Sequence, residues 1–128
     1  MFRSMLEGIA YEYGEWARIS PAATLREARV LGGGAASALW NQIKADVLGI
    51  AWVPTVRSEC GVLGDALIAA AATGHIKDPA ATALEWQKTT EPLQPAPERV
   101  SLYIRYREAY SLLAESIAPV FRAIGQQS

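Results

Sequence analysis

The sequence predicts a helix-rich α/β domain built around one parallel βαβ unit. Apolar residues recur at helical spacing over most of the chain. A short aliphatic strand over 28–31 enters three consecutive glycines, Gly32, Gly33 and Gly34, and an amphipathic helix follows as far as Leu48. A second apolar strand over 50–56 comes directly afterwards. Strand, helix and strand in about thirty residues imply parallel pairing with a crossover helix.

Local signals set the expected bounds in the first half of the chain. Ser20-Pro21 should end a first helix, because proline disfavours the helical conformation of the preceding residue. Ser37 is the expected N-cap of the helix after the glycines, and Gly49 is its expected C-cap. Pro54 suits the end of a strand or an edge strand. The first helix is indicated by an apolar series at helical spacing: Phe2, Met5, Leu6, Ile9, Tyr13 and Trp16.

The second half should hold three more helices. An alanine-rich helix over 61–73 ends at Gly74, and Asp78-Pro79 begins a short helix through Trp86. Three prolines indicate an extended linker over 89–97. A long helix over 98–124 follows, which Pro119 should kink or interrupt. Its expected apolar face consists of Leu102, Tyr106, Ala109, Leu113 and Ile117.

Composition narrows the classes of protein. The 128 residues, 51% of them apolar, suit one domain with a core. The net charge of −1 with no basic stripe argues against a nucleic-acid partner. Cys60 is the single cysteine, so no internal disulfide can form. No apolar run is long enough to span a bilayer, and we expect a soluble, cytoplasmic protein.

The small number of strands is unusual. Two strands are rarely stable alone, and a parallel pair normally belongs to a wider sheet covered on both faces. The chain also begins within a helix that has no capping residue. We therefore expect the chain to be one part of a larger domain.

The three glycines form the candidate binding site. Glycine tolerates φ > 0 and lets another group approach the backbone, and a helix N-terminus that follows such a turn favours anions such as phosphate. The segment is not a P-loop, because no Lys-Ser or Lys-Thr follows. It is also a poor dinucleotide fingerprint, since Ser37 stands where the third glycine would be. From the pattern alone, a tightly packed turn without a ligand is an equal alternative.

Other polar residues give weaker signals. His75 and Cys60 each lie near a helix end without an evident catalytic partner. Glu7 and Glu59 are not brought together by their spacing, and Asp65 fits a local variation better than a metal ligand. The charged residues of the last helix are expected on a solvated face: Glu98, Arg99, Arg105, Arg107 and Glu108. We assign no catalytic residue and no metal ligand in this chain.

Several segments resemble the FGGY carbohydrate kinases in order and spacing, over nearly the whole chain. Residues 3–11 are similar to the family's Arg-Ala-x-Leu-Glu-Gly-Ile-Ala helix. Residues 32–42 are similar to its Gly-Gly-Gly-Ala-x-Ser-x-x-Trp-x-Gln segment, most closely as xylulokinases carry it. Residues 45–49 match Ala-Asp-x-x-Gly. The last matches are Glu59, Leu63-Gly64 and Ala66, and the tyrosines Tyr103, Tyr106 and Tyr110.

This resemblance implies a ribonuclease-H-like domain of the actin, Hsp70 and hexokinase type. Residues 1–128 would be the C-terminal, nucleotide-binding part of it. This part would be incomplete, with further strands expected upstream of Met1. The resemblance also implies that Gly33 and Gly34 lie along ATP, with Gly32 and Ser37 as further nucleotide-binding positions. Mg²⁺ would be held mainly by parts outside this chain. The catalytic aspartate and most sugar-binding residues of the family have no counterpart here, so the chain alone should be inactive. Ala38 replaces an asparagine of glycerol kinases.

Three functions are therefore compared. The first is the ATP-binding part of a xylulokinase-like kinase, which transfers the γ-phosphoryl of ATP to a sugar hydroxyl. The second is a non-catalytic helical interaction module, or a truncated product that a partner completes. The third, an NAD-binding unit, lacks an acidic residue at 54–56, where Pro54, Thr55 and Val56 stand. Self-association or a missing N-terminal half would explain the small sheet. The residues of this chain do not identify which sugar a complete kinase would phosphorylate.

Overall fold

The computed structural model describes residues 1–19, 25–56 and 59–125. Every element expected from the sequence is present within about two residues of its expected bounds. The expected helix stop at Ser20-Pro21 lies outside the described residues. The elements in chain order are α1 (Phe2–Ile19), β1 (Glu27–Val30), η1 (Gly33–Ala36), α2 (Ala38–Leu48), β2 (Ala51–Pro54), α3 (Cys60–Ala72), α4 (Pro79–Trp86) and α5 (Pro97–Gly125).

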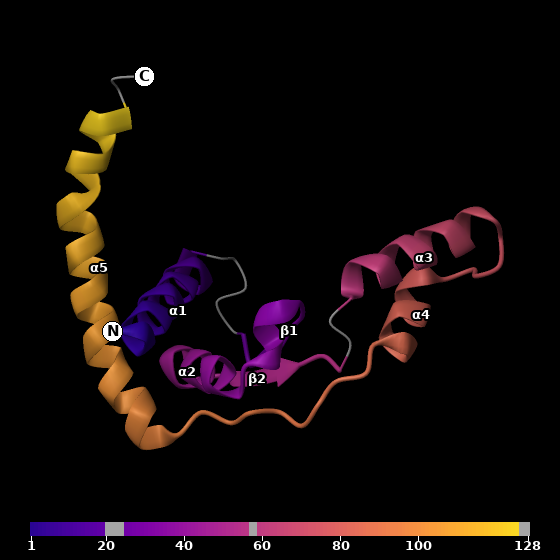
Figure 1. Ribbon diagram of the computed structural model, residues 1–128, viewed down its shortest axis with the longest axis horizontal. Coiled ribbons are helices and arrows are strands. Elements are labelled where there is room, and N and C mark those ends of the chain that lie inside the picture. The colour runs from indigo at the N-terminus through magenta and orange to yellow at the C-terminus, as the bar shows by residue number, and fades with distance from the viewer. Residues whose placement is uncertain (20–24, 57–58, 126–128) are drawn as a thin grey trace.

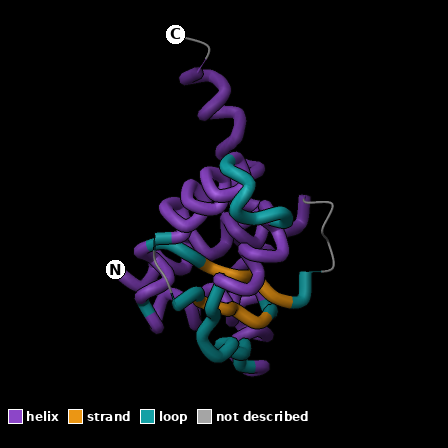
Figure 2. Tube along the Cα trace, turned by 90° about the vertical axis from the view of Figure 1, so that its right-hand side faces the viewer, coloured by secondary structure: helices purple, strands orange, loops and turns teal. Residues whose placement is uncertain are grey.

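The sheet has two parallel strands in the described part of the chain, as predicted. Glu27 of β1 lies opposite Ala51 of β2, and Val30 lies opposite Pro54. The proline-rich segment is not merely a linker, because it forms one antiparallel bridge with β2, Trp52–Leu93, and a second just after β2, Thr55–Thr89. The backbone of this segment therefore forms hydrogen bonds with the N–H and C=O groups of Trp52 on the side of β2 away from β1. Figure 2 shows the two strands side by side among the helices.

Helix α2 is the centre of the fold. It packs against α1, α5, β2 and η1 (Figure 1). The buried core joins Ala10 of α1, Ile43 and Val47 of α2, and Tyr103 of α5. Gly49 ends α2 in the left-handed conformation, with φ 69°, and donates its N–H to Ala45. This confirms the predicted C-cap. Three buried side chains of α2 are nevertheless polar: Asn41, Lys44 and Asp46.

Asp46 attaches the start of α5 to α2. Its carboxylate accepts hydrogen bonds from the Ala96 N–H at 2.9 Å, from Gln42 at 2.9 Å and from Arg99 Nε at 2.5 Å. Arg99 remains 43% exposed on the predicted solvated face, but it also pairs with this buried carboxylate. A buried charge requires such partners, and here the donors come from α2 itself and from Ala96 and Arg99 where α5 begins. The prediction of a solvated face is wrong for Arg107, which is half-buried with a buried Nε.

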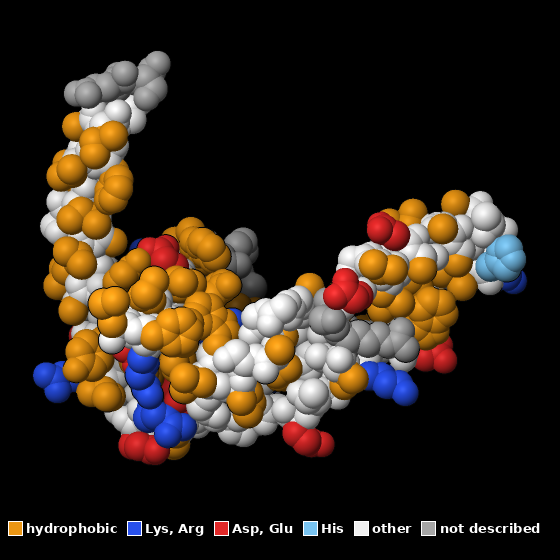
Figure 3. Space-filling model, viewed as in Figure 1, with side chains coloured by type: hydrophobic (Ala, Val, Ile, Leu, Met, Phe, Trp, Pro, Cys, Tyr) orange, Lys and Arg blue, Asp and Glu red, His pale blue; other side chains and the backbone are white. Residues whose placement is uncertain are grey.

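Helix α5 docks on α1 through polar contacts. The Tyr103 hydroxyl donates to Glu7 at 2.7 Å, Tyr110 donates to Glu12, and Ser111 donates to Glu15 at 2.5 Å. The expected apolar face is not the docked one, because its members are exposed. The helix is also continuous through Pro119 and is not interrupted there. Its far end extends away from the body, with hydrophobic side chains along its length (Figures 1 and 3).

Helices α3 and α4 form a hairpin at the opposite end of the molecule (Figure 1). The Asp78 side chain accepts from the Ala81 N–H at 2.9 Å, which confirms the predicted N-cap and first-turn proline of α4. Among the described residues, no helix is long and apolar enough to cross a membrane.

Candidate functional site

The glycine segment leaves β1 and forms a turn before α2 begins. Gly32 has φ 86° and ψ −178°, a conformation that is essentially confined to glycine. Its carbonyl accepts the Ala35 N–H at 3.0 Å and begins the 3₁₀ turn η1. The predicted turn between β1 and α2 therefore takes the form of a 3₁₀ turn. The extended residue Ser37 stands between this turn and α2.

Gly33 and Gly34 differ from Gly32 in what the fold requires of them. Neither has a positive φ, and both are exposed. A Cβ atom built on either residue would meet no atom of the described chain within 4 Å. The fold itself therefore gives no reason for glycine at these two positions. A bare backbone here leaves room for a group that approaches from outside the chain.

Ser37 has a structural role in this arrangement. It is extended, and its hydroxyl accepts the Trp40 N–H at 3.3 Å, which confirms the predicted N-cap of α2. Ser37 is exposed beside the glycines. One lone pair and the hydroxyl proton remain for other partners.

Asn41 holds the turn from beneath, and sequence reasoning missed it. Its side-chain nitrogen donates to the Ala35 carbonyl at 2.7 Å, and its side-chain oxygen accepts from Trp52 Nε1 at 3.2 Å. Asn41 is 2% exposed. The indole of Trp52 on β2 therefore orients the Asn41 carboxamide on α2. That carboxamide in turn holds the Ala35 carbonyl of η1 in place. The available signal was a polar residue at an inward-facing position of a helix.

Lys44 lies one turn further along α2 in an aromatic setting. Its ammonium is 4.3 Å from the ring centre of Trp40, 5.3 Å from Trp52 and 5.5 Å from Tyr13. No acidic side chain of the described residues pairs with it. Burial lowers the pKa of Lys44 to about 8, while the ring faces favour the charged form.

The remaining polar candidates do not form a catalytic group. Glu7 binds Tyr103 and Arg3 on the face between α1 and α5, and Glu59 stands at the start of α3. His75 contacts the Thr73 hydroxyl at 2.8 Å on the exposed end of α3. Within the described ranges, no three metal-ligating side chains gather in one place.

Comparison with known proteins decides the family. The model of the FGGY family of carbohydrate kinases, C-terminal domain, matches residues 1–73, from α1 through β1, the glycine turn, α2 and β2 to the end of α3. The chain belongs to the FGGY family of carbohydrate kinases. The family resemblance seen in the sequence is thereby confirmed.

Relatives and solved structures agree with this assignment. A glycerol kinase of Deinococcus radiodurans is 33% identical over 112 residues, which are 84% of this chain and 22% of the relative. An autoinducer-2 kinase of an Enterobacter species is 42% identical over 73 residues, 56% of this chain and 14% of the relative. A xylulose kinase of Lactobacillus acidophilus has the same fold, with a TM-score of 0.80 and 18% identity over 91% of this chain and 24% of that one.

These comparisons confirm the fold class. The chain has a helix-rich part of the fold found in these FGGY kinases, with a small parallel sheet in its described residues. The chain covers between 14% and 24% of the length of these relatives.

Proposed function

We propose that this FGGY chain is the ATP-binding C-terminal part of a xylulokinase-like carbohydrate kinase. The complete reaction would transfer the γ-phosphoryl group of Mg-ATP to a sugar hydroxyl. The observation that carries the proposal is the bare backbone of Gly33 and Gly34, which the fold does not require. The sugar class rests on the glycine segment with Ala38, which is similar to that of xylulokinases.

The residues of this chain would bind and orient the nucleotide. Gly33 and Gly34 would allow the phosphates or ribose of ATP to approach the backbone, and Gly32 would set the direction of the turn. Ser37 would offer its hydroxyl at the rim. The nucleotide, with Mg²⁺, supplies the phosphoryl group, and positioning accounts for much of the catalysis in such transfers.

The general base and the sugar site would come from polypeptide outside this chain. No aspartate here is assigned to deprotonate a sugar hydroxyl, and no cluster of metal ligands occurs in the described residues. We expect the 128-residue chain alone to bind ATP weakly and to phosphorylate no sugar. A coupled assay of ADP release over pentoses, hexoses and polyols should stay at background.

Ligand-detected NMR with Mg-ATP tests the binding role directly. The wild-type chain should show saturable contact in the millimolar range, about 4 kcal/mol. Gly34→Asp should abolish that contact, because the carboxylate fills the open space and repels phosphate. Ala38→Ser is the matched control at the exposed start of α2 and should bind like wild type. Circular dichroism must show that Gly34→Asp is folded. Absence of contact with wild type, or equal binding by folded Gly34→Asp, contradicts the proposal.

One observation favours the alternative of a helical interaction module. The far end of α5 carries apolar side chains that are more than half exposed, including Leu113 at 55% and Phe121 at 66%. Light scattering separates the two functions when it is combined with the NMR experiment. An oligomer that binds no ATP would support the interaction module, whereas ATP contact that depends on Gly34 supports the kinase part.

A further inference from the structure

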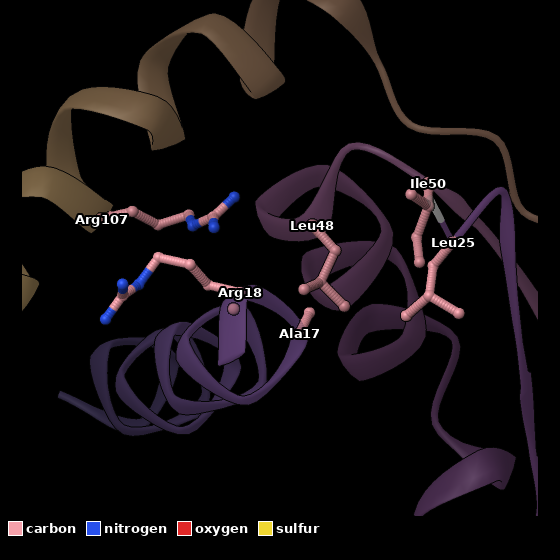
Figure 4. A pocket seen from close by; sticks show the side chains of 7 residues that line it. Ala17, Arg18, Leu25, Leu48, Ile50 and Arg107 are labelled. Carbon is pink, nitrogen blue, oxygen red and sulfur yellow. The ribbon is translucent and has the colours of Figure 1, made fainter. Parts of the chain in front are cut away.

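A cavity of about 330 Å³ lies between α1, α2 and α5, away from the glycine turn (Figure 4). Leu48 and Ile50 form an apolar wall near the end of α2, and Leu25 completes it. Gly14 of α1 and two arginines, Arg18 and Arg107, line the rest. Among the described residues, the cavity lining therefore combines apolar surface with positive charge and contains no acidic side chain.

Arg107 is placed in this cavity by a specific feature of α1. Its guanidinium lies against Gly14, and a Cβ atom on Gly14 would be only 2.9 Å from Arg107 Nε. Gly14 is a helical residue without positive φ, so its backbone does not require glycine. The glycine instead makes room for the arginine. Figure 4 shows Arg107 reaching from α5 towards Leu48.

The hydrogen-bonding capacity of Arg107 is largely unused. Nη1 donates to the Val47 carbonyl at 3.3 Å, and the buried Nε has no partner. No carboxylate of the described residues lies within ion-pair distance of this guanidinium. An arginine with five donors and one long bond is under-satisfied for a half-buried charge.

Two carboxylates, Glu15 and Glu108, lie beside both arginines in a neighbouring pocket, and Glu15 is already engaged. Glu15 accepts from Ser111 at 2.5 Å and from Arg18 at 3.1 Å. The Ser111 hydrogen bond, the Arg18 pair and the charge of Arg107 lower the pKa of Glu15, although burial opposes this shift. Figure 4 shows Arg18 running in the opposite direction from Arg107. Because the Arg18 side chain is 65% exposed, it can turn towards an anion in the cavity.

We propose that this cavity binds a small amphipathic anion, meaning one carboxylate or phosphate group on a short apolar body. The anionic group pairs with Arg107, with Arg18 as a second donor, and the apolar body rests on Leu48, Ile50 and Leu25. Guanidinium groups bind carboxylates and phosphates through paired, charge-assisted hydrogen bonds. The proposal is independent of ATP binding at the glycine turn.

Chemical-shift titration of the 128-residue chain tests the ligand class. Hexanoate and phenyl phosphate represent the carboxylate and the phosphate, and each should shift the amide signals of Gly14 and Leu48 saturably. 1-Hexanol lacks the anionic group, and acetate and inorganic phosphate lack the apolar body. Each of these three should bind at least tenfold more weakly than hexanoate or phenyl phosphate. Equal binding of hexanoate and hexanol, or of hexanoate and acetate, overturns the proposal. Whichever of hexanoate and phenyl phosphate binds more tightly identifies the anion that the arginines prefer.

Two substitutions test the site without relying on the chosen probes. Gly14→Ala should displace the guanidinium of Arg107 and weaken hexanoate at least tenfold, whereas Gly34→Asp should leave hexanoate binding unchanged. Leu25→Glu places a carboxylate at the exposed wall, where it should act as an internal ligand. At low salt it should melt at a higher temperature than Leu25→Gln and should block hexanoate. If Leu25→Glu melts no higher than Leu25→Gln, Arg107 serves only to join the three helices and the proposal is wrong.

Discussion

Replacing Asn41 by aspartate should reveal how the glycine turn is held. The substitution keeps the shape of the side chain but removes its only donor group, the NH2 of the amide. In the native chain that donor bonds the Ala35 carbonyl at 2.7 Å, in a residue that is 2% exposed. The variant instead directs a buried carboxylate at a carbonyl oxygen. Losing the hydrogen bond and burying an unpaired charge should cost about 3 kcal/mol at neutral pH.

The cost should disappear in acid. Burial and the facing carbonyl raise the folded-state pKa of the introduced carboxyl above the ordinary value of about 3.9. Between the unfolded and the raised folded pKa, the folded variant binds more protons, so the destabilisation is relieved as the pH falls through this window. The protonated acid can donate to Ala35 and still accept the indole N–H of Trp52.

Urea unfolding followed by circular dichroism, at pH values from about 4 to 8, measures this effect as a difference from wild type. Asn41→Leu is the matched control, because it removes both hydrogen bonds and cannot titrate. Its difference from wild type should be the same at all pH values. Hydrogen exchange at residues 33–36 should be faster in Asn41→Asp at neutral pH and should recover in acid. If the two variants show parallel pH profiles, Asn41 does not donate to the turn and the reasoning is refuted.

Three further predictions concern Lys44, the glycine turn and Asp46, and each is measured by chemical unfolding. Lys44→Met should be more stable than wild type below pH 8, because burial penalises the ammonium. The folded-state pKa of Lys44 is about 8 and its ordinary value is 10.5, so the stability of the wild type rises with pH between these two values. The difference in stability between Lys44→Met and wild type should therefore shrink towards pH 10.5. A variant less stable than wild type at pH 7 would show that the aromatic contacts outweigh the burial penalty. Gly32→Ala should cost roughly 1–3 kcal/mol through its φ, whereas Gly34→Ala should be nearly neutral, and equal losses would contradict the open space at Gly34. Asp46→Asn should cost about 2–4 kcal/mol, because the amide turns a donor towards existing donors, and a loss below that of Arg99→Gln would show that the carboxylate does not organise the start of α5.

Local chemistry made much of this fold predictable. Ser37, Gly49 and Asp78 each mark a helix end through a cap that needs only neighbouring residues. The parallel pairing of β1 and β2 follows from the length of the segment between them. The proline-rich segment was harder, because its bridges to β2 depend on residues about forty positions apart, which no local pattern shows.

The long helix shows where amphipathic patterning fails. Its most regular apolar series, which includes Leu102, Tyr106 and Leu113, is exposed, with values of 47%, 53% and 55%. The docked face instead uses Tyr103 and Tyr110, whose hydroxyls meet glutamates of α1. Periodicity ranks faces by apolar content, whereas this interface combines the buried ring of Tyr103 with hydrogen bonds from tyrosine hydroxyls to glutamates. Such contacts depend on a partner helix that lies about a hundred residues away in the chain.

The glycine segment combines two different requirements that one sequence motif cannot separate. Gly32 is required by its backbone conformation, and any larger residue there is strained whatever binds nearby. Gly33 and Gly34 face open space, so their requirement must come from outside the described chain if it exists. The buried pair of Asn41 and Trp52 then fixes the far end of the same turn without exposing a side chain to that space. The turn is thus fixed by the buried Asn41, and at Gly33 and Gly34 no side chain covers its outer backbone. Such a turn suits a backbone that must stay in one position while a nucleotide approaches it.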